Sequence, residues 1–316
     1  MKSGTVPILS LLFLSICCVS CSSDDPVSLI QPSTTLIQME GEGGSTGVSF
    51  TGGDWKITGV TNTNGNVKIS GDSYSVDDEL IRENYTLSLE GLGRMEAFGG
   101  IKGFVITRNT PTSLNIALKE NSSGEDLNFT IDLQSGNESK EITVEQKKSQ
   151  GYKFESIEYA LREIDGDSLF TKKGTTYEFN IQSPSPQEFS FSPFEGIEIN
   201  RKAYFKSNEK DAFVWLKNDP VRVKVPSLID NSKIDTAEQK EVYTNLTTVY
   251  PHGFEQMETV TVPSGKSVFF TQIQFRRRTV SYTLHLTNKR TGDKKAIDGK
   301  WIEIAPTGIY DIKGMD

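Results

Sequence analysis

The chain has 316 residues, of which 35% are hydrophobic, and a formal net charge of −8 at pH 7. Its three cysteines all lie within residues 1–21, which excludes disulfides, thiolate metal sites and a cysteine nucleophile from the rest of the chain. The only histidines, His252 and His285, are far apart, and no nucleophile motif flanks either of them. We therefore expect a protein that is not an enzyme and that holds no metal and no cofactor.

The first 20 residues have the pattern of a signal peptide. Lys2 supplies a positive start, and an apolar run of about 13 residues follows, shorter than the roughly 20 that a membrane-spanning helix needs. Small Ser20 then precedes Cys21. This order resembles a bacterial lipobox, which implies that Cys21 becomes the lipidated first residue of the mature chain. The alternative is an ordinary secretory signal in which the cysteines are incidental.

Residues 21–33 are polar, and we expect them to form a lipidated tether. Their start, Ser22-Ser23-Asp24-Asp25, resembles the export signal of surface lipoproteins in the Bacteroidetes. The resemblance implies a protein that is anchored in the outer membrane by lipid and exposed at the cell surface. The membrane is therefore an expected partner, through the lipid anchor, and nucleic acid is not.

Residues 34–148 show the alternation of apolar and polar residues that is typical of half-buried strands. Three such runs are 114–118, 129–133 and 142–146, and the turns between them are rich in Asn, Ser and Gly. Helical periodicity is nearly absent. These observations predict an antiparallel β-sandwich.

The same region resembles the BACON family of immunoglobulin-like domains. The resemblance rests on Asp54-Trp55-Lys56-Ile57, on the run 114–118 followed by Asn121, and on Ile142-Thr143-Val144-Glu145-Gln146. It implies an immunoglobulin-like sandwich that binds carbohydrate or serves as a spacer. We expect Trp55 to pack between the two sheets as a core residue rather than to form a platform for sugar stacking.

Lys147 to Gly151 is a polar break that predicts a domain boundary, and residues 152–316 form the second predicted domain. Strand patterns continue there, and the one helix candidate is Ile234 to Val242, which Asp235 or Thr236 could cap. The fold class predicted for the whole chain is all-β. An N-terminal immunoglobulin-like β-sandwich is followed by a second antiparallel β domain with long strands.

The segment from Glu258 to Thr287 is unusually extended. Its apolar residues keep one parity up to Phe275 and take the other parity from Val280 onward. A one-residue slip along a strand reverses the face to which every side chain points. The phase change across Arg276–Arg278 therefore predicts a bulge, a bend or a hairpin tip at the three arginines.

Val262-Pro263-Ser264-Gly265, at the start of this segment, is similar to the V-P-P-G motif of aerolysin-like β-pore-forming proteins. The resemblance implies a pore-forming effector in which a Ser/Thr-rich hairpin inserts into a membrane. The candidate hairpin, residues 175–199, contains Pro184, Pro186 and Pro193, which would remove ladder hydrogen bonds that a bilayer cannot replace. We therefore rank pore formation as the second candidate function.

Basic residues are concentrated toward the C-terminus. Between Ser264 and Lys300 there are nine basic and only two acidic residues, in a chain that is acidic overall. This asymmetry favours an acidic partner, and we predict a non-catalytic binding or adhesion role with acidic glycans as the candidate ligand. The alternative is a solvated face balanced by acidic loops. The predicted ligand-binding residues are Arg276, Arg277, Arg278, Lys289, Arg290, Lys294 and Lys295.

Two short sequences, Asp167-Ser168-Leu169 and Asp235-Thr236-Ala237, resemble the acceptor sequence of O-glycosylation in the Bacteroidetes, an Asp, a Ser or Thr, and an aliphatic residue. The implied acceptors are Ser168 and Thr236. Both lie in the second predicted domain.

Overall fold

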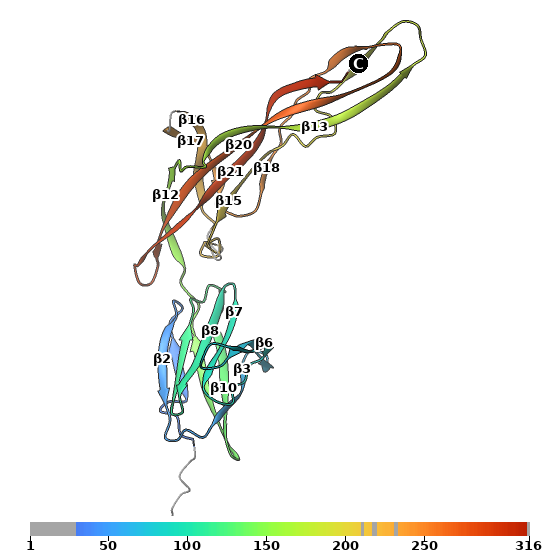
Figure 1. The fold of residues 1–316 in the computed structure, drawn as a ribbon. Helices are drawn as coiled ribbons and strands as arrows, with labels where there is room; N and C mark the ends of the chain where they lie inside the picture. The colour runs from blue at the N-terminus through green and yellow to red at the C-terminus, as the bar shows by residue number, and fades with distance from the viewer. Residues whose placement is uncertain (1–29, 210–211, 217–219, 231–232, 315–316) are drawn as a thin grey trace, which may run out of the picture.

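The computed structural model describes residues 30–209, 212–216, 220–230 and 233–314. The predicted signal peptide and most of the tether, including Cys21, lie outside the described residues. The described part of the chain is all-β. It contains no helix, and therefore no helix that could cross a membrane. Two modules lie end to end, the N-terminal module (residues 30–146) and the longer C-terminal module (residues 152–314), as Figure 1 shows.

The N-terminal module contains two sheets. Its strands are β1 (Leu36–Met39), β2 (Gly44–Ser49), β3 (Lys56–Asn62), β4 (Val67–Lys68), β5 (Ser70–Tyr74), β6 (Leu80–Thr86), β7 (Gly93–Gly99), β8 (Lys102–Thr110), β9 (Ser113–Leu118), β10 (Leu127–Ser135) and β11 (Glu138–Gln146). One sheet has the order β1-β11-β10-β3-β4 and the other has the order β2-β9-β8-β7-β5-β6. Strands β1 and β11 run parallel, and the other neighbouring strands run antiparallel. The predicted sandwich of antiparallel strands is confirmed.

The core of this module lies between the two sheets. The alternating residues of β9, β10 and β11 are buried, and Phe104 of one sheet stacks on Phe129 of the other with 4.4 Å between ring centroids. Trp55 is only 4% exposed and lies 4.3 Å from the ring of Phe50. The prediction that Trp55 is a core residue is confirmed.

The first described residue is also part of this core. Ile30 is fully buried, and Pro32 forms a β-bridge with Phe50. The predicted tether extended to residue 33, so its last four residues were assigned wrongly. Burying an isoleucine side chain contributes about 1.5–3 kcal/mol, which favours docking these residues against the sandwich over leaving them in solvent.

The C-terminal module is built around one long sheet with two smaller ribbons. Its strands are β12 (Tyr152–Ala160), β13 (Gly166–Ile181), β14 (Gln187–Phe191), β15 (Arg201–Ser207), β16 (Arg222–Asp230), β17 (Lys233–Val242), β18 (Thr248–Tyr250), β19 (Glu258–Val262), β20 (Gly265–Asn288) and β21 (Lys294–Lys313). The sheet has the order β12-β20-β21-β15-β18, with β13 pairing the far part of β20. Strands β14 and β19 form one ribbon, and β16 and β17 form the other.

Strand β20 runs for 24 residues through the predicted break. Arg276, Arg277 and Arg278 each pair in register with both β13 and β21, so no bulge, bend or hairpin tip lies at them. The prediction of an interruption there was wrong. The nearest irregularity is in the partner strand β21, where Thr307 to Ile309 interrupt the register between Ile273 and Phe275.

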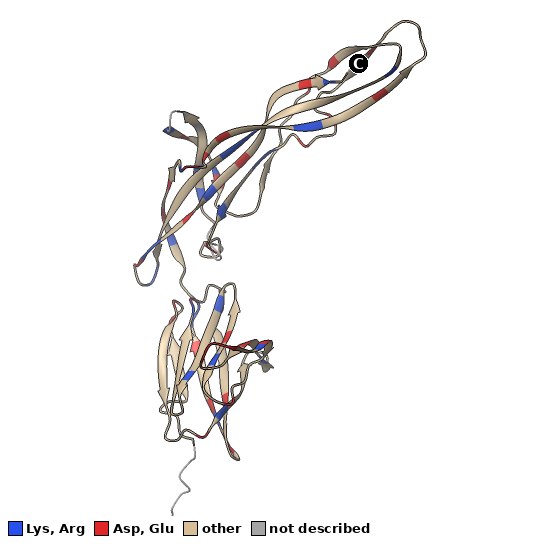
Figure 2. Ribbon diagram, in the orientation of Figure 1, with Lys and Arg blue, Asp and Glu red and all other residues tan. Residues whose placement is uncertain are grey.

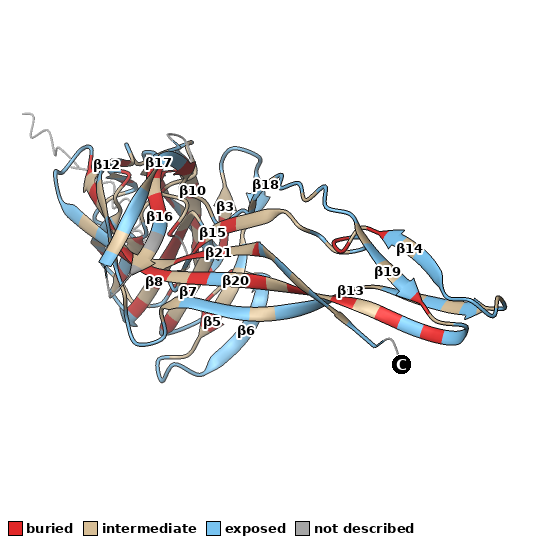
Figure 3. Cartoon of the chain, turned by 90° about the horizontal axis from the view of Figure 1, so that it is seen from above, coloured by how far each residue is buried: buried red, intermediate tan, exposed pale blue. Residues whose placement is uncertain are grey.

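Instead, the phase change marks the point along β20 at which the buried face of the strand changes from one side of the sheet to the other. Toward the distal end, where the C-terminus lies in Figure 1, the β14–β19 ribbon and its flanking loops cover Phe269, Ile273 and Phe275. Closer to the N-terminal module, the opposite face is covered, and Val280, Tyr282, Leu284 and Leu286 are buried with residues of β16. Bands of buried residues therefore follow β20 along its length (Figure 3).

The predicted helix from Ile234 to Val242 is strand β17, so this prediction was wrong. The segment pairs with β16, from Asp230 opposite Lys233 to Arg222 opposite Val242. A helix this short is marginal in water, and most of its residues are exposed. Ladder hydrogen bonds to a neighbouring strand stabilise the segment better than a single exposed turn or two of helix.

Polar contacts join the two modules. Arg290, in the turn between β20 and β21, forms an ion pair with Glu42 of the N-terminal module. The Tyr152 hydroxyl donates to the carboxylate of Glu120 at 3.0 Å, and the Ser149 hydroxyl donates to the same carboxylate at 2.8 Å. The junction therefore depends on two carboxylates of the N-terminal module.

Candidate functional site

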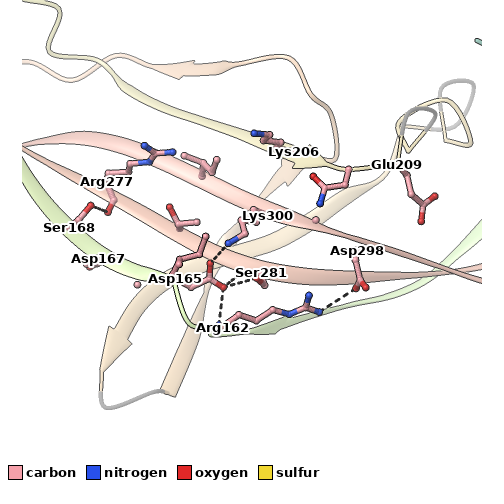
Figure 4. Close-up of a pocket in the computed structure, with 16 residues that line it drawn as sticks. Arg162, Asp165, Asp167, Ser168, Lys206, Glu209, Arg277, Ser281, Asp298 and Lys300 are labelled. Carbon is pink, nitrogen blue, oxygen red and sulfur yellow. Dashed lines mark hydrogen bonds and ion pairs between the residues drawn. The ribbon is translucent and has the colours of Figure 1, made fainter.

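A groove of about 710 Å³ opens on the C-terminal sheet at the point where the β14–β19 ribbon and its flanking loops no longer cover the sheet. Strands β20, β21 and β15 form its floor, and the loop between β12 and β13 forms one wall (Figure 4). We call the sheet face that it occupies the groove face. The residues that line the groove are Arg162, Ile164, Asp165, Gly166, Asp167, Ser168, Lys206, Asn208, Glu209, Arg277, Thr279, Ser281, Asp298, Gly299, Lys300 and Ile302.

Asp165 fixes the wall of the groove to its floor. Its side chain is fully buried and accepts hydrogen bonds from Lys300 Nζ at 2.8 Å, Ser281 Oγ at 2.6 Å and the backbone N–H groups of Ser281 and Arg162 at 3.0 Å (Figure 4). Burial alone would raise the pKa of Asp165, but these hydrogen bonds outweigh it and lower the pKa. The carboxylate is therefore ionised and holds the loop in place.

The charges in the groove are balanced in number but not all paired. Four lining residues are basic and four are acidic. Lys300 is paired with Asp165, and Arg162 lies 3.6 Å from Asp298. Within the described residues, no acidic side chain pairs with Arg277 or Lys206, and both side chains are exposed. These two cations are available to a ligand.

Of the seven basic residues predicted to bind a ligand, Arg277 alone lines this groove. Its two neighbours point to the other face of the sheet. Arg278 is 2% exposed and binds Asp167 with two hydrogen bonds of 2.9 and 3.0 Å. Arg276 lies 3.2 Å from Glu303. Among the three arginines of the predicted cluster, Arg277 is therefore the one to which no described acidic residue is paired.

The other four predicted residues lie at the junction between the modules. Arg290 pairs with Glu42, and Lys294 donates to Thr287 at 2.6 Å. The ammonium of Lys295 lies 4.2 Å from the ring centroid of Trp215, and the backbone N–H of Lys289 donates to Gly151. Each is already engaged by a residue nearby.

The structure does not bring the arginines and these junction residues together. Thirteen positions separate Arg277 from Arg290, which at about 3.3 Å per residue is roughly 40 Å. Acidic and basic residues are interspersed along both modules (Figure 2). The excess of basic residues in the sequence does not form one positive surface.

The two predicted glycosylation acceptors are exposed. Ser168 lies on β13 at the edge of the groove, where its hydroxyl donates to the Arg277 carbonyl at 3.4 Å. Thr236 lies on β17, away from the groove. Cys21 lies outside the described residues.

Sequence reasoning missed Lys206, Asp165 and Lys300 as residues of one site. Lys206 and Lys300 are 94 positions apart and meet because β15 pairs with β21. No motif surrounds any of the three, so no local signal identifies them. Within the described ranges there is also no group of three His, Cys, Asp or Glu residues that could hold a metal ion.

No protein-family model matches the chain, and no curated protein matches it. Several solved structures are similar to it, including the following three. A protein from Bacteroides thetaiotaomicron, determined by NMR, has 18% identity and a TM-score of 0.27, covering 41% of this chain and 98% of that one. The parasporin-2 toxin of Bacillus thuringiensis, which recognizes cancer cells, has 9% identity and a TM-score of 0.35, covering 52% and 73%. The lamprey immune protein has 10% identity and a TM-score of 0.29, covering 90% of each chain. At these TM-scores the similarities carry no argument about function.

Proposed function

We propose that this protein is a lipid-anchored lipoprotein of the outer membrane that binds acidic glycans at the cell surface without catalysis. The observation that carries the proposal is that one groove holds two cations, Arg277 and Lys206, for which the described part of the chain supplies no acidic partner. A cation without an acidic partner in a concave site attracts an anionic ligand, and the guanidinium fork fits a carboxylate with two parallel hydrogen bonds.

The rest of the groove supports this proposal. Its volume falls within the roughly 300–1,000 Å³ that is usual for small-molecule sites. Ile164, which is 78% exposed, supplies apolar surface, and Ser168, Thr279 and Asn208 supply hydroxyl and amide groups. A mixture of apolar surface with a few fixed polar groups is suited to a sugar ring.

Binding to acidic glycans by the soluble chain, residues 22–316, tests the proposal. We expect Arg277→Gln to weaken retention on an acidic glycan column, whereas the matched control Arg222→Gln, an exposed arginine on β16, should not. Retention should also fall with salt, because the screening length shortens from about 10 Å at 0.1 M to about 3 Å at 1 M. If both variants and the unchanged protein are retained equally, the glycan does not bind through Arg277, and the groove is not the binding site.

The anchor is tested separately. Cys21→Ala should abolish labelling by a clickable fatty acid and release the protein from the outer membrane. The acyl chains of such an anchor contribute about 0.8 kcal/mol for each buried methylene group, so their loss should weaken membrane binding strongly. Fatty-acid labelling of the Cys21→Ala protein would contradict the proposed lipidation.

Pore formation remains the alternative, and the observation that favours it is the length of β20 and β21, 24 and 20 residues. Pro184 and Pro186 lie in the connection between β13 and β14, outside both strands. However, β13 pairs with β20 and β14 pairs with β19, so the predicted hairpin is not a paired unit here. Dye release from liposomes at micromolar protein, without retention on acidic glycans, would reverse the order of the two functions.

A further inference from the structure

We infer that the groove takes an extended chain of carboxylated sugars that spans both of its free cations, rather than a single acidic sugar. The inference rests on the proposed glycan binding and adds the ligand class to it. It comes from the register of the strands that form the floor of the groove.

The register places the groove residues in rows across the sheet. Ser281 pairs with Lys300, and Lys300 pairs with Lys206, so these three share one row. Arg277 pairs with Ile304, which lies four residues further along β21 than Lys300. At about 3.3 Å per residue, the two rows are about 13 Å apart along the strands.

The two free cations are further apart than the rows. Arg277 is on β20 and Lys206 is on β15, with β21 between them. Two strand spacings add about 9.6 Å across the sheet, so the Cα atoms of Arg277 and Lys206 are about 16 Å apart. Side chains on strands stand roughly perpendicular to the sheet, so the two charged groups keep a separation of this order and do not converge on one point. A single sugar ring is shorter than this separation, so an extended ligand is needed to contact both cations.

The row between the cations is neutral. Thr279 pairs with Ile302 there, and Ile302 is 3% exposed. A ligand that fills the groove therefore meets a cation, then the Thr279 hydroxyl beside a buried isoleucine, and then the second cation with Lys300 beside it. This order fits a carboxylated oligosaccharide that places two acid groups on the cationic rows and a sugar ring between them.

Charge density alone does not explain such binding. The lining holds as many acidic as basic residues, and Glu209 and Asp298 lie near the Lys206 end. A polyanion therefore gains binding free energy only where its acid groups contact Arg277 and Lys206. The spacing of the acid groups becomes the feature that the groove selects.

The test is a length series. The soluble chain is titrated calorimetrically with galacturonic acid and with its oligomers of two to six units. We expect affinity to rise at least about tenfold once the oligomer spans the groove and then to level off, because two linked contacts exceed either one by a large factor. Arg277→Gln and Lys206→Gln should each remove this gain with length, and the double variant should also lose the single contact that each of them keeps. The control Arg222→Gln should keep the full gain.

Two results would overturn the inference, and they differ from a failure of the proposed function. A monomer that binds as tightly as the hexamer in an Arg277-dependent way would show that one cation suffices, and glycan binding would stand. Affinity that grows without a plateau and falls equally in Arg222→Gln would show binding by overall charge. Binding at no length, by a chain with unchanged circular dichroism, would overturn both the inference and the proposed function.

Discussion

Phe275 and Arg277 lie two positions apart on the same face of β20, yet Phe275 is 1% exposed and Arg277 is exposed to solvent. The layer that covers the distal part of the sheet, formed by the β14–β19 ribbon and its flanking loops with Phe194, ends between them. The groove begins at this point because the sheet continues while its cover does not. A single strand is thus a core strand at one end and forms the floor of the groove further along.

The first prediction concerns the core of the N-terminal module. Trp55→Ala should lower the free energy of unfolding by about 3–5 kcal/mol, the range for large aromatic residues in cores. The guanidinium of Arg108 lies 3.7 Å from the ring centroid of Trp55, so the substitution also removes a stacked neighbour. Urea unfolding of the full soluble chain measures the loss. Val67→Ala, at a side chain that is 63% exposed, is the control and should change stability by less than about 0.5 kcal/mol.

The second prediction concerns the wall of the groove. Asp165→Asn should cost about 1.5–3 kcal/mol at neutral pH, because hydrogen bonds to an ionised, fully buried carboxylate are lost. The lowered pKa of Asp165 means that this stabilisation is complete above the ordinary value of about 3.9 and is lost as pH falls through the lower pKa of the folded protein. The difference between the two proteins should therefore shrink below about pH 3.9. A difference that stays constant as pH falls through that range would contradict the assignment.

The third prediction concerns the junction between the modules. Burial raises the pKa of Glu120, and hydrogen bonds from Ser149 and Tyr152 offset only part of this effect. A carboxyl with a raised pKa stabilises the folded state fully below its unfolded pKa, about 4.3, and this contribution is lost as pH rises through the folded pKa. Glu120→Gln keeps hydrogen-bonding groups for both hydroxyls without the buried charge. The urea midpoint of the variant should equal that of the unchanged protein near pH 4 and should be higher near pH 8. A lower midpoint for the variant at both values would refute this account.

The fourth prediction concerns the ribbon at the distal end. The ring of Phe269 lies 5.0 Å from Tyr177 and 5.1 Å from Phe191, so it holds the β14–β19 ribbon to the long sheet. Phe269→Ala should cost about 3–5 kcal/mol locally and speed amide exchange in β14 and β19 on the order of a hundredfold or more. Val268→Ala is the matched control, because Val268 is adjacent, points to the other face and is 44% exposed. Equal exchange in both variants would show that the ribbon is held by other contacts.

The sandwich class and three strands of the N-terminal module could be predicted from the sequence, because strand alternation is a local signal. The runs 114–118, 129–133 and 142–146 became β9, β10 and β11 with the expected residues buried. Trp55 followed from the same pattern. In the C-terminal module, alternation also identified strands, but it could not show which face of β20 each ribbon covers. The phase change at the arginines was therefore read as a break in the strand.

The site was less predictable, because charge pairing depends on contacts between distant residues. Asp167 is 111 positions from Arg278, and Glu42 is 248 positions from Arg290. A count of basic residues in one segment cannot include acids that fold against it from elsewhere. Arg277 was among the predicted residues, but nothing in the sequence distinguished it from its neighbours or joined it to Lys206.

The pairing of β20 with β21 has a mechanical consequence. The two strands are hydrogen-bonded from Thr287 opposite Lys294 to Phe270 opposite Lys313, along the long axis of the C-terminal module. Ladder hydrogen bonds lie perpendicular to the strands, so tension along this axis loads many of them in shear at the same moment. The polar junction at Glu42 and Glu120 has far fewer bonds to share the same load. Under a pull between the two ends of the molecule, the modules should separate at the junction before the long sheet yields.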